Sequence, residues 1–222
     1  MKLTALLPMK GHSERVPNKN MRLFADKPLY HCVAKVLQKS DYIETIVINT
    51  DSDIIAEDAT KHFSKVKIHI RPENIRGDMV PMNDIIAHDI NHHSGEHFLQ
   101  THSTNPLLSV KALEEGIKTY FSMPDKFDSV FSVTRWQTRL YWSSGKPINH
   151  NPEELIRTQD LSPVFEENSN FYIFSKKSFK KTENRRIGLR PKMFVMDKIE
   201  AVDIDEESDF KLAETLYMMK ST

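Results

Sequence analysis

The sequence is poor in cysteine and has no long hydrophobic run, and both absences exclude classes of protein. The only cysteine among the 222 residues is Cys32, so no internal disulfide can form and a disulfide-stapled secreted domain is excluded. Cys32 lies in the apolar part of an expected helix, which favours a core residue over a nucleophile. No apolar run approaches the roughly 20 residues of a membrane span, and no signal-peptide pattern opens the chain. We therefore expect a cytoplasmic protein with no membrane partner.

Neither sign of charge is in excess. Lys plus Arg and Asp plus Glu number 31 each, which gives no reason to expect nucleic acid or an anionic membrane as a partner. Any site for an anion must therefore come from local clustering. With 39% hydrophobic residues, the chain is long enough to form one large domain, or one domain with a modest lobe.

The first cluster of cations follows the first apolar run. Leu3 to Leu7 has the composition of a buried strand, Pro8 ends it, and Gly11 permits a backbone turn. The loop that follows the strand carries Lys10, Ser13, Arg15 and Lys19. Backbone N–H groups and cationic side chains in such a loop suit a phosphate group, although an ordinary solvated loop fits the local pattern equally well. GxxxxGK[ST] and GxGxxG are both absent, which excludes a Walker loop and a dinucleotide fingerprint.

Strands and helices alternate along most of the chain. Hydrophobic periodicity predicts strands at 3–7, 43–49, 67–70, 98–99, 129–133, 171–175 and 194–204, and helices at 28–40, from about 54, 83–93, 111–121 and 206–219. This order predicts an α/β fold with a mainly parallel sheet covered on both faces, and ligands at the carboxyl ends of its strands. From Trp136 to Asn168 the rhythm breaks at one glycine and three prolines, and we expect an excursion from the sheet there.

Two neighbouring aspartates, Asp203 and Asp205, give the sharpest acidic signal. Residues two apart on the expected strand point to the same face, so both carboxylates can converge, and oxygen ligands of this kind suit Mg²⁺. A helix-entry cluster in which Asp205 or Ser208 caps the last helix fits the pattern equally well. Asp209 is expected to be structural because it lies in or beside that helix.

Histidines crowd together at His88, His92, His93 and His97. No cysteine and no HExxH spacing accompanies them, so a solvated, weakly metal-binding surface is favoured over a zinc site. His102 differs because it follows a strand end, where we expect it to form hydrogen bonds to a ligand. The basic run at 180–190, which includes Arg186, is interpreted as a solvated face rather than as a source of catalytic arginines.

Several short motifs occur in an order that is typical of one family. Residues 7–20 read LPMKGHSERVPNKN and closely follow the form IPARGGSKRIPRKNI. Residues 27–29, 50–52, 71–73 and 104–107 are similar to GKPL, to TDS, to RPxEL and to the TSPL of QPTSPLR. The stretches at 157–160, 187–188 and 203–210 complete the order. Together they resemble the acylneuraminate cytidylyltransferase family over essentially the whole chain.

The resemblance implies both a fold and a reaction. The fold is a Rossmann-like three-layer nucleotidyltransferase domain over residues 1–222, with an inserted dimerisation lobe at about 136–168, in a homodimer with partly shared sites. The reaction is the transfer of CMP from CTP to a sialic-acid-like 2-keto-3-deoxy sugar acid, with release of pyrophosphate and with Mg²⁺ as cofactor. The alternatives are a 3-deoxy-octulosonate or another polyol as acceptor, a nucleotide-binding relative that has lost catalysis, and a zinc-binding regulator that uses the histidine cluster.

The resemblance also implies roles for individual residues. It assigns the triphosphate to Lys10, Gly11, Ser13, Arg15 and Lys19, of which Lys10, Arg15 and Lys19 are the candidate catalytic cations and Lys19 the best candidate at the reacting phosphate. It assigns the surroundings of the nucleotide to Thr50, Asp51 and Arg71, and Mg²⁺ to Asp203 and Asp205. It assigns the sugar to His102, Arg157 and Gln159, with Arg157 able to pair with the sugar carboxylate.

Some positions depart from the family pattern. Lys10 stands where arginine is usual, which keeps the charge but loses bidentate contact with phosphate. His12 and Glu14 make the loop bulkier and less cationic. Further along the chain, His102 replaces a glutamine, Ser103 a proline and Leu108 an arginine. These changes lie mostly in the expected sugar-facing region, so they affect the identity of the acceptor more than the type of reaction.

Overall fold

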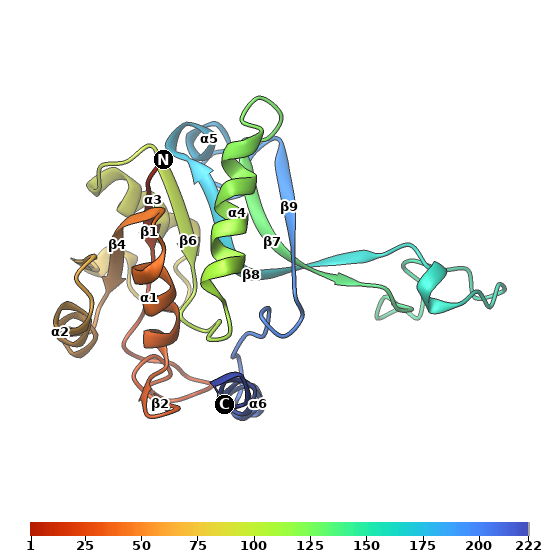
Figure 1. The fold of residues 1–222 in the computed structure, drawn as a ribbon, viewed down its shortest axis with the longest axis horizontal. Coiled ribbons are helices and arrows are strands. Elements are labelled where there is room, and N and C mark those ends of the chain that lie inside the picture. Colours follow the sequence, from red (N-terminus) through yellow and green to blue (C-terminus); the bar gives the residue numbers. More distant parts are fainter. Residues whose placement is uncertain (222) are drawn as a thin grey trace.

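The computed structural model describes residues 1–221 and contains a seven-stranded sheet with helices on both faces (Figure 1). The strands lie in the order β5-β4-β1-β6-β8-β7-β9. Their bounds are β1 (Leu3–Leu6), β4 (Ile43–Thr50), β5 (Val66–Ile70), β6 (His97–Thr101), β7 (Ser129–Trp136), β8 (Val164–Ser175) and β9 (Pro191–Met196). Only β8 runs antiparallel to its neighbours in this sheet. The prediction of a mainly parallel α/β fold is therefore confirmed.

The helices form a layer on each side of this sheet. The chain also contains α1 (Tyr30–Lys39), α2 (Asp53–His62), α3 (Met82–His92), α4 (Val110–Ser122), α5 (Lys176–Lys181), α6 (Glu207–Ser221), the short 3₁₀ turns η1 (Glu73–Ile75) and η2 (Thr158–Asp160), and a small ribbon of β2 (Leu23–Phe24) and β3 (Lys27–Pro28). Among the described residues, no helix combines the length and the apolar character that a membrane crossing needs.

The central strand β1 explains why two layers of helices are needed. All four of its residues are buried, and their side chains alternate between the two faces. Leu3 and Ala5 pack into a core with α1 and α4, whereas Leu6 packs into a second core with α3 and α5. A strand that is apolar on both faces can be satisfied only by helices on both sides.

The helix α6 docks away from the sheet, against the segment that follows β1. Phe210 and Ala213 join a third cluster with Val16, Phe24 and Cys32. The ring of Phe210 meets that of Phe24 edge to face, with 5.5 Å between centroids. Cys32 is buried here, as the sequence predicts, and burial raises its pKa to about 11, so the thiol does not ionise at neutral pH.

Residues 137–163 project from the sheet as an arm, which Figure 1 shows beyond the joined ends of β7 and β8. Large apolar side chains are exposed along it, among them Trp142 and Leu155, which are 62% and 91% exposed. The arm begins and ends on adjacent strands because Trp136 pairs with Val164. The break in the alternation of strands and helices thus coincides with a long excursion from the sheet.

The expected strand at 194–204 is wrong beyond its first residues. The strand β9 ends at Met196, because the side chain of Asp197 accepts a hydrogen bond from the N–H of Ile199 at 2.8 Å and its carbonyl accepts one from Ala201 at 3.0 Å. Such an Asx turn competes with extension of the strand. Asp203 and Asp205 consequently lie in a loop, and the alternation of a strand does not orient them.

The contact between α4 and β8 generates the first prediction. A Cβ atom at Gly116 would lie 2.6 Å from Cζ of the Phe171 ring. In an open helix, Gly→Ala would raise the free energy of unfolding by roughly 0.5–1 kcal/mol. Here we expect Gly116→Ala to lower it by about 1–3 kcal/mol, because the ring has to move in a packed core.

Urea unfolding of the two variants would measure this. The matched control is Glu115→Ala, an exposed position on the same helix, which we expect to change the free energy of unfolding by no more than about 0.5 kcal/mol. An increase in stability for Gly116→Ala would show that the close packing of α4 on β8 is not real.

Candidate functional site

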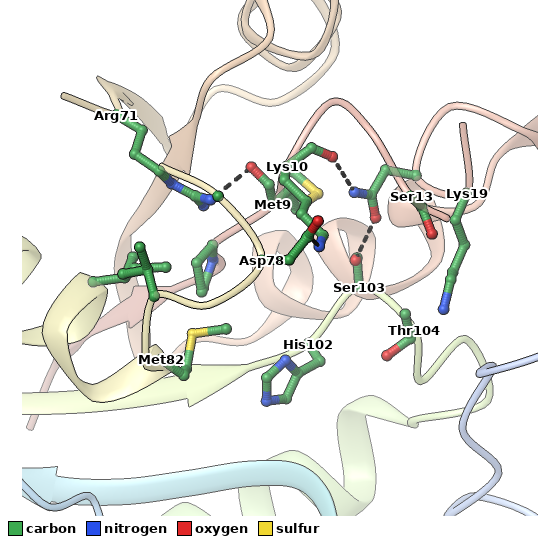
Figure 2. Close-up of a pocket in the computed structure, with 15 residues that line it drawn as sticks. Met9, Lys10, Ser13, Lys19, Arg71, Asp78, Met82, His102, Ser103 and Thr104 are labelled. Carbon is green, nitrogen blue, oxygen red and sulfur yellow. Dashed lines mark hydrogen bonds and ion pairs between the residues drawn. The ribbon is translucent and has the colours of Figure 1, made fainter. Parts of the chain in front are cut away.

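A pocket opens at the carboxyl ends of β1, β5 and β6, where an α/β sheet of this type binds its ligands. Its volume is about 280 Å³, and its walls come from three segments, at 8–20, 71–85 and 102–104. Figure 2 shows Arg71 and Met82 at one end of the pocket and Lys19 at the other. Among the residues proposed from the sequence, those that line it are Lys10, Ser13, Lys19, Arg71 and His102.

Arg71 is buried in the floor of the pocket and holds two strand ends together. Its Nε donates to Oδ1 of Asn49 at 2.7 Å, and its Nη2 donates to the carbonyl oxygens of Asn49 at 2.9 Å and Met9 at 3.2 Å. Burial lowers the pKa of Arg71, and the carboxylates of Asp51 and Asp89 oppose this shift. A guanidinium stays charged even so, and most of its donors are already used by the sheet.

The structure requires glycine at position 11 because of a close packing contact, rather than because of the backbone turn that the sequence suggests. A Cβ atom there would lie 2.8 Å from Cβ of Ser52, so close approach of the loop to the next strand end excludes a side chain. The N–H of Gly11 donates to Oδ1 of Asp51 at 2.7 Å and is not free to bind a phosphate in this structure. Thr50 is buried, and its Oγ1 accepts from the N–H of Ser52. Thr50 and Asp51 therefore shape the loop.

Lys10 pairs with Asp78, a residue for which the sequence suggested no role. The ammonium group of Lys10 contacts Oδ1 of Asp78 across the pocket (Figure 2), and this hydrogen bond holds the pKa of Asp78 below its usual value. The two side chains are 42% and 50% exposed, so the pair is open to exchange with a ligand. No signal in the sequence links these residues, because 68 positions separate them.

Lys19 is the most enclosed of the loop cations. Its side chain is buried, and Nζ donates to the carbonyl oxygen of Ile204 at 2.6 Å. Burial lowers the pKa of Lys19, while the carboxylates of Asp205 and Asp203 act to raise it. Arg15, by contrast, is exposed and pairs with Asp205 at 2.7 Å between Nη2 and Oδ1. Both cations thus face the segment that precedes α6.

The side chain of Asn20 connects the loop after β1 to the segment at 102–104, the third wall of the pocket. Its Nδ2 donates to the carbonyl oxygen of Lys10 at 2.9 Å, and its Oδ1 accepts from Oγ of Ser103 at 2.6 Å. A side chain that bonds both to its own loop and to a neighbouring one limits the motion of both. Asn20 belongs to the motif recognised in the sequence, but its role was missed because it depends on a partner 83 positions away.

Two kinds of aspartate lie around the start of α6: Asp203 and Asp205 precede the helix, and Asp209 lies in its first turn. Burial raises the pKa of Asp203, a hydrogen bond from Thr104 lowers it, and the nearby charge of Asp205 raises it again. Asp209 instead accepts from the N–H groups of Asp205 and Glu206, at 3.1 and 2.8 Å. The side chain of Asp209 therefore caps the last helix, a role expected for Asp205 or Ser208 if the cluster were only a helix entry. Asp203 and Asp205 stay close to each other and to Lys19.

His102 belongs to a polar chain behind the pocket. The amide nitrogen of Gln100 lies 3.1 Å from Nε2 of His102, and Oε1 of Gln100 accepts from Nη1 of Arg186 at 2.7 Å. Burial and the charge of Arg186 lower the pKa of His102 to about 4, so the ring is neutral at pH 7. The guanidinium of Arg186 stacks over the ring of Tyr172 at 4.0 Å. Arg186 is thus part of a network behind the pocket rather than of a solvated face.

Arg157 and Gln159 lie in the arm and do not line the pocket of their own chain. Arg157 is 72% exposed and pairs with Asp160 at 2.7 Å between Nε and Oδ2. Gln159 is in the 3₁₀ turn η2, and its carbonyl oxygen accepts from Nε2 of Gln137 at 2.6 Å. Their predicted contact with the sugar therefore stays a prediction, one that requires a second copy of the chain.

The chain can be compared with known proteins. The cytidylyltransferase family profile matches residues 4–221. The chain belongs to the cytidylyltransferase family. The resemblance seen in the motifs is thereby confirmed, and the match includes the loop after β1, the arm and the acidic segment before α6.

Named relatives of this family member act on several acidic sugars. The N-acylneuraminate cytidylyltransferase of Escherichia coli is 25% identical over 99% of the chain, and form A of that enzyme from Danio rerio is 29% identical over 96%. The chain spans about half the length of these two relatives, 53% and 50%. The pseudaminic acid cytidylyltransferase of Campylobacter jejuni is 24% identical, with 98% of the chain and 97% of the relative covered.

Solved structures support the fold. A CMP:2-keto-3-deoxy-manno-octonic acid synthetase, solved in complex with CTP, superposes with a TM-score of 0.71 at 13% identity and covers 99% of the chain and 100% of the solved structure. A 4-diphosphocytidyl-2C-methyl-D-erythritol synthase from Anaerococcus prevotii superposes with a TM-score of 0.69 at 11% identity and covers 98% and 99%. At such identities the likeness concerns the fold alone.

The buried position of Arg71 generates a second prediction. Arg71→Met would leave the carbonyl oxygens of Met9 and Asn49 and the Asn49 side chain without their donors. Because an unpaired buried polar group costs roughly 1–3 kcal/mol, we expect the free energy of unfolding to fall by at least about 2 kcal/mol. Arg135→Met makes the same chemical change at an exposed position and should be nearly neutral in urea unfolding. Equal stability of the two variants would contradict a structural role for Arg71.

Proposed function

We propose that the pocket binds CTP and that the protein transfers CMP from it to a sialic-acid-like 2-keto-3-deoxy sugar acid, with release of pyrophosphate. The observation that carries this proposal is the convergence of loop cations and carboxylates around the end of β1, in a chain that belongs to the cytidylyltransferase family. The relatives named for N-acylneuraminate, pseudaminic acid and N,N'-diacetyllegionaminic acid support an acceptor of this class.

The proposed reaction needs charge neutralisation and positioning more than covalent chemistry. The anomeric hydroxyl oxygen forms a bond to the α-phosphorus, and the bond from that phosphorus to the oxygen bridging to the β-phosphate breaks. Pyrophosphate leaves with the electron pair, and the hydroxyl proton passes to the solution. Cations held in place before the reaction stabilise the negative charge that gathers on the departing group. Lys19 suits this role because its ammonium is already fixed by Ile204 and enclosed.

The Lys10–Asp78 pair suits the entry of a triphosphate. In the free pocket Asp78 neutralises Lys10, so a ligand phosphate would take the place of one carboxylate. The exposure of both side chains keeps the cost of that exchange low, since exposed ion pairs contribute only about 0–1 kcal/mol. Asp78 then lies beside the bound phosphates, and its like charge favours release of the products.

The acidic segment fits a magnesium ion by the chemistry of its donors. Asp203 and Asp205 offer carboxylate oxygens beside the phosphate-facing loop, and Mg²⁺ takes one or two carboxylates together with substrate phosphates. The raised pKa of Asp203 marks a carboxylate that burial destabilises when it is ionised, and a bound cation would relieve that cost. When bound, Mg²⁺ would neutralise phosphate charge. Asp205 would then have to exchange Arg15 for the ion.

The acceptor end of the proposed site combines one residue of the pocket with residues of the arm. His102 is neutral, and with Nε2 facing the amide nitrogen of Gln100 its Nδ1 can donate to a sugar hydroxyl. Arg157 and Gln159 would come from a partner subunit, since they do not reach the pocket of their own chain. The arm exposes several large hydrophobic side chains, among them Trp142 and Leu155, and in the proposed homodimer a partner chain would cover them.

Pyrophosphate release is the experiment that tests the proposal. The protein is supplied with Mg²⁺ and CTP, and in parallel with a neuraminate, a legionaminate, a pseudaminate and a 3-deoxy-octulosonate. We expect release with one of the first three acids. Release only with the octulosonate would keep the reaction and replace the acceptor. Absence of release with all four, together with CTP binding, would favour a relative that has lost catalysis, and absence of CTP binding would refute the nucleotide site.

The variant Asp203→Asn tests whether Asp203 binds the proposed magnesium ion or instead stabilises the folded loop. We expect pyrophosphate release to fall by at least about 100-fold, because the variant removes a ligand charge. The free energy of unfolding at pH 7 should not fall. A carboxyl whose folded pKa is raised contributes stability only at low pH, where it is protonated, and loses that contribution as the pH rises through this pKa.

The matched control for this variant is Asp125→Asn, at an exposed aspartate outside the pocket, which should leave both quantities unchanged. Full activity of Asp203→Asn at ordinary Mg²⁺ concentrations would remove Asp203 from the proposed metal site. Loss of activity together with a large loss of stability would instead show that Asp203 supports the loop.

A further inference from the structure

A second group of polar side chains gathers at the outer edge of the sheet, away from the pocket lining. His69 lies on the edge strand β5, and His88 and His92 lie one turn apart on α3. One ring nitrogen from each of the three lies within 4.8 Å of the others. The rings of His88 and His92 stack with centroids 4.0 Å apart. The sequence places the last two together but cannot show His69, which comes from another element.

Two other histidines of the expected cluster have different positions. Nε2 of His93 lies 3.1 Å from Nδ1 of His69, so His93 contacts the group from the side. Nδ1 of His97 lies 3.0 Å from the hydroxyl of Tyr120, and His97 is not among the residues whose ring nitrogens converge. The converging set is therefore His69, His88 and His92, with His93 as a neighbour.

The hydrogen bonds of the described residues leave a ring nitrogen of His88 and one of His92 available. Nδ1 of His88 is buried and finds no hydrogen-bond partner among the residues that the structure describes. Nδ1 of His92 lies 2.8 Å from the carbonyl oxygen of His88 and donates to it, which leaves the lone pair on Nε2 available. Nδ1 of His69 faces Nε2 of His93 at 3.1 Å, and a ring nitrogen of His69 converges with one from each of the other two rings. Neutral imidazoles with free lone pairs are ligands for a metal.

A second group of potential metal ligands provides a contrast. His31, Asp58 and His62 also bring their ligand atoms together, but a carboxylate lies between the two rings. Asp58 accepts from the hydroxyl of Tyr30 and lies 2.6 Å from Nε2 of His31 and 3.2 Å from Nδ1 of His62. These groups satisfy one another without an ion. At the sheet edge, by contrast, the carboxylate of Asp89 lies 3.6 Å from Nδ1 of His69 and is not part of the converging set.

We propose that His69, His88 and His92 form a binding site for a divalent transition metal of the zinc class. Two histidines four apart on one helix face, with a third ligand from elsewhere, are a recurring zinc arrangement. With Zn–N bonds of about 2.0–2.1 Å in a tetrahedron, the nitrogens would be about 3.4 Å apart. The ring nitrogens now lie within 4.8 Å of one another, so a bound ion would draw them closer, and three protein ligands leave the fourth position for water.

Asp89 supplies the outer shell that such a site needs. Its carboxylate is buried, its Oδ1 lies 3.6 Å from Nδ1 of His69, and its Oδ2 has no hydrogen-bond partner among the described residues. A carboxylate behind a ligating histidine orients the ring and increases its basicity. Asp89 also accepts from Nδ2 of Asn49 at 2.6 Å, and Asn49 accepts from Arg71 in the floor of the pocket. Asp89 thus links the proposed metal site with the pocket, through a 3.6 Å contact to His69 on one side and hydrogen bonds through Asn49 to Arg71 on the other.

Zinc titration of the tag-free, 222-residue chain by calorimetry tests the proposal. After treatment with a chelator, we expect one Zn²⁺ per chain at this site, and His92→Gln should weaken its affinity at least about 100-fold, since loss of an outer-shell partner alone costs up to about that much. His92 is exposed, so the substitution should leave the fold intact. A zinc-dependent rise of the melting temperature in wild type, but not in His92→Gln, gives a second readout.

Three controls define the site. His97→Gln and His62→Gln remove histidines outside the proposed set and should bind zinc as wild type does. Asp203→Asn should also retain zinc binding, which distinguishes this site from the proposed magnesium site, and excess Mg²⁺ should not compete because it prefers oxygen ligands. The proposal is overturned if wild type binds zinc no more tightly than His92→Gln. It is equally overturned if His62→Gln loses binding while His92→Gln retains it.

Discussion

The buried guanidinium of Arg71 is the constraint on which the rest of the site depends. A charged group can be removed from water only where its donors meet acceptors of fixed position. Here those acceptors are the carbonyl oxygens of Met9 and Asn49 and the side chain of Asn49. The end of β1 is thereby held to the end of β4, and the loop that follows β1 starts from a fixed point. Asn49 extends the same set of hydrogen bonds to Asp89 at the sheet edge.

The cations around the pocket and the groups that pair with them lie far apart in the sequence but are in contact in the structure. The loop after β1 supplies the cations, and segments far along the chain supply their partners: Lys10 faces Asp78, Arg15 faces Asp205, and Lys19 faces the carbonyl of Ile204. A chain without net charge can therefore still concentrate positive groups where a phosphate is expected. Because these contacts hold the side chains before any ligand arrives, less conformational entropy remains to be lost on binding.

Features set by local periodicity could be predicted from the sequence, and features set by distant partners could not. The strand at Leu3–Leu6 and the helix at Val110–Ser122 follow from their apolar patterns. Arg186 looked like part of a solvated run, because its partner Gln100 is 86 positions away. The strand predicted at 194–204 is too long, because the Asx turn at Asp197 outweighs the apolar pattern and ends β9 at Met196. His69 lies in the strand predicted at 67–70, but the sequence gives no sign that its ring meets those of His88 and His92 on α3.

The hydrogen bond from Lys19 to Ile204 joins residues 185 positions apart, and Figure 1 shows α6 close to the β2 segment that follows this loop. Phe210 and Ala213 bury the apolar cluster at Val16 and Phe24. On a ribosome, residues are released in order, so the early loop is synthesised long before its partners. Until the segment at 203–213 has emerged, the nascent chain exposes that apolar cluster and an uncompensated lysine. The pocket is therefore completed only after that segment has emerged, and until then the growing chain offers chaperones a surface that is later buried.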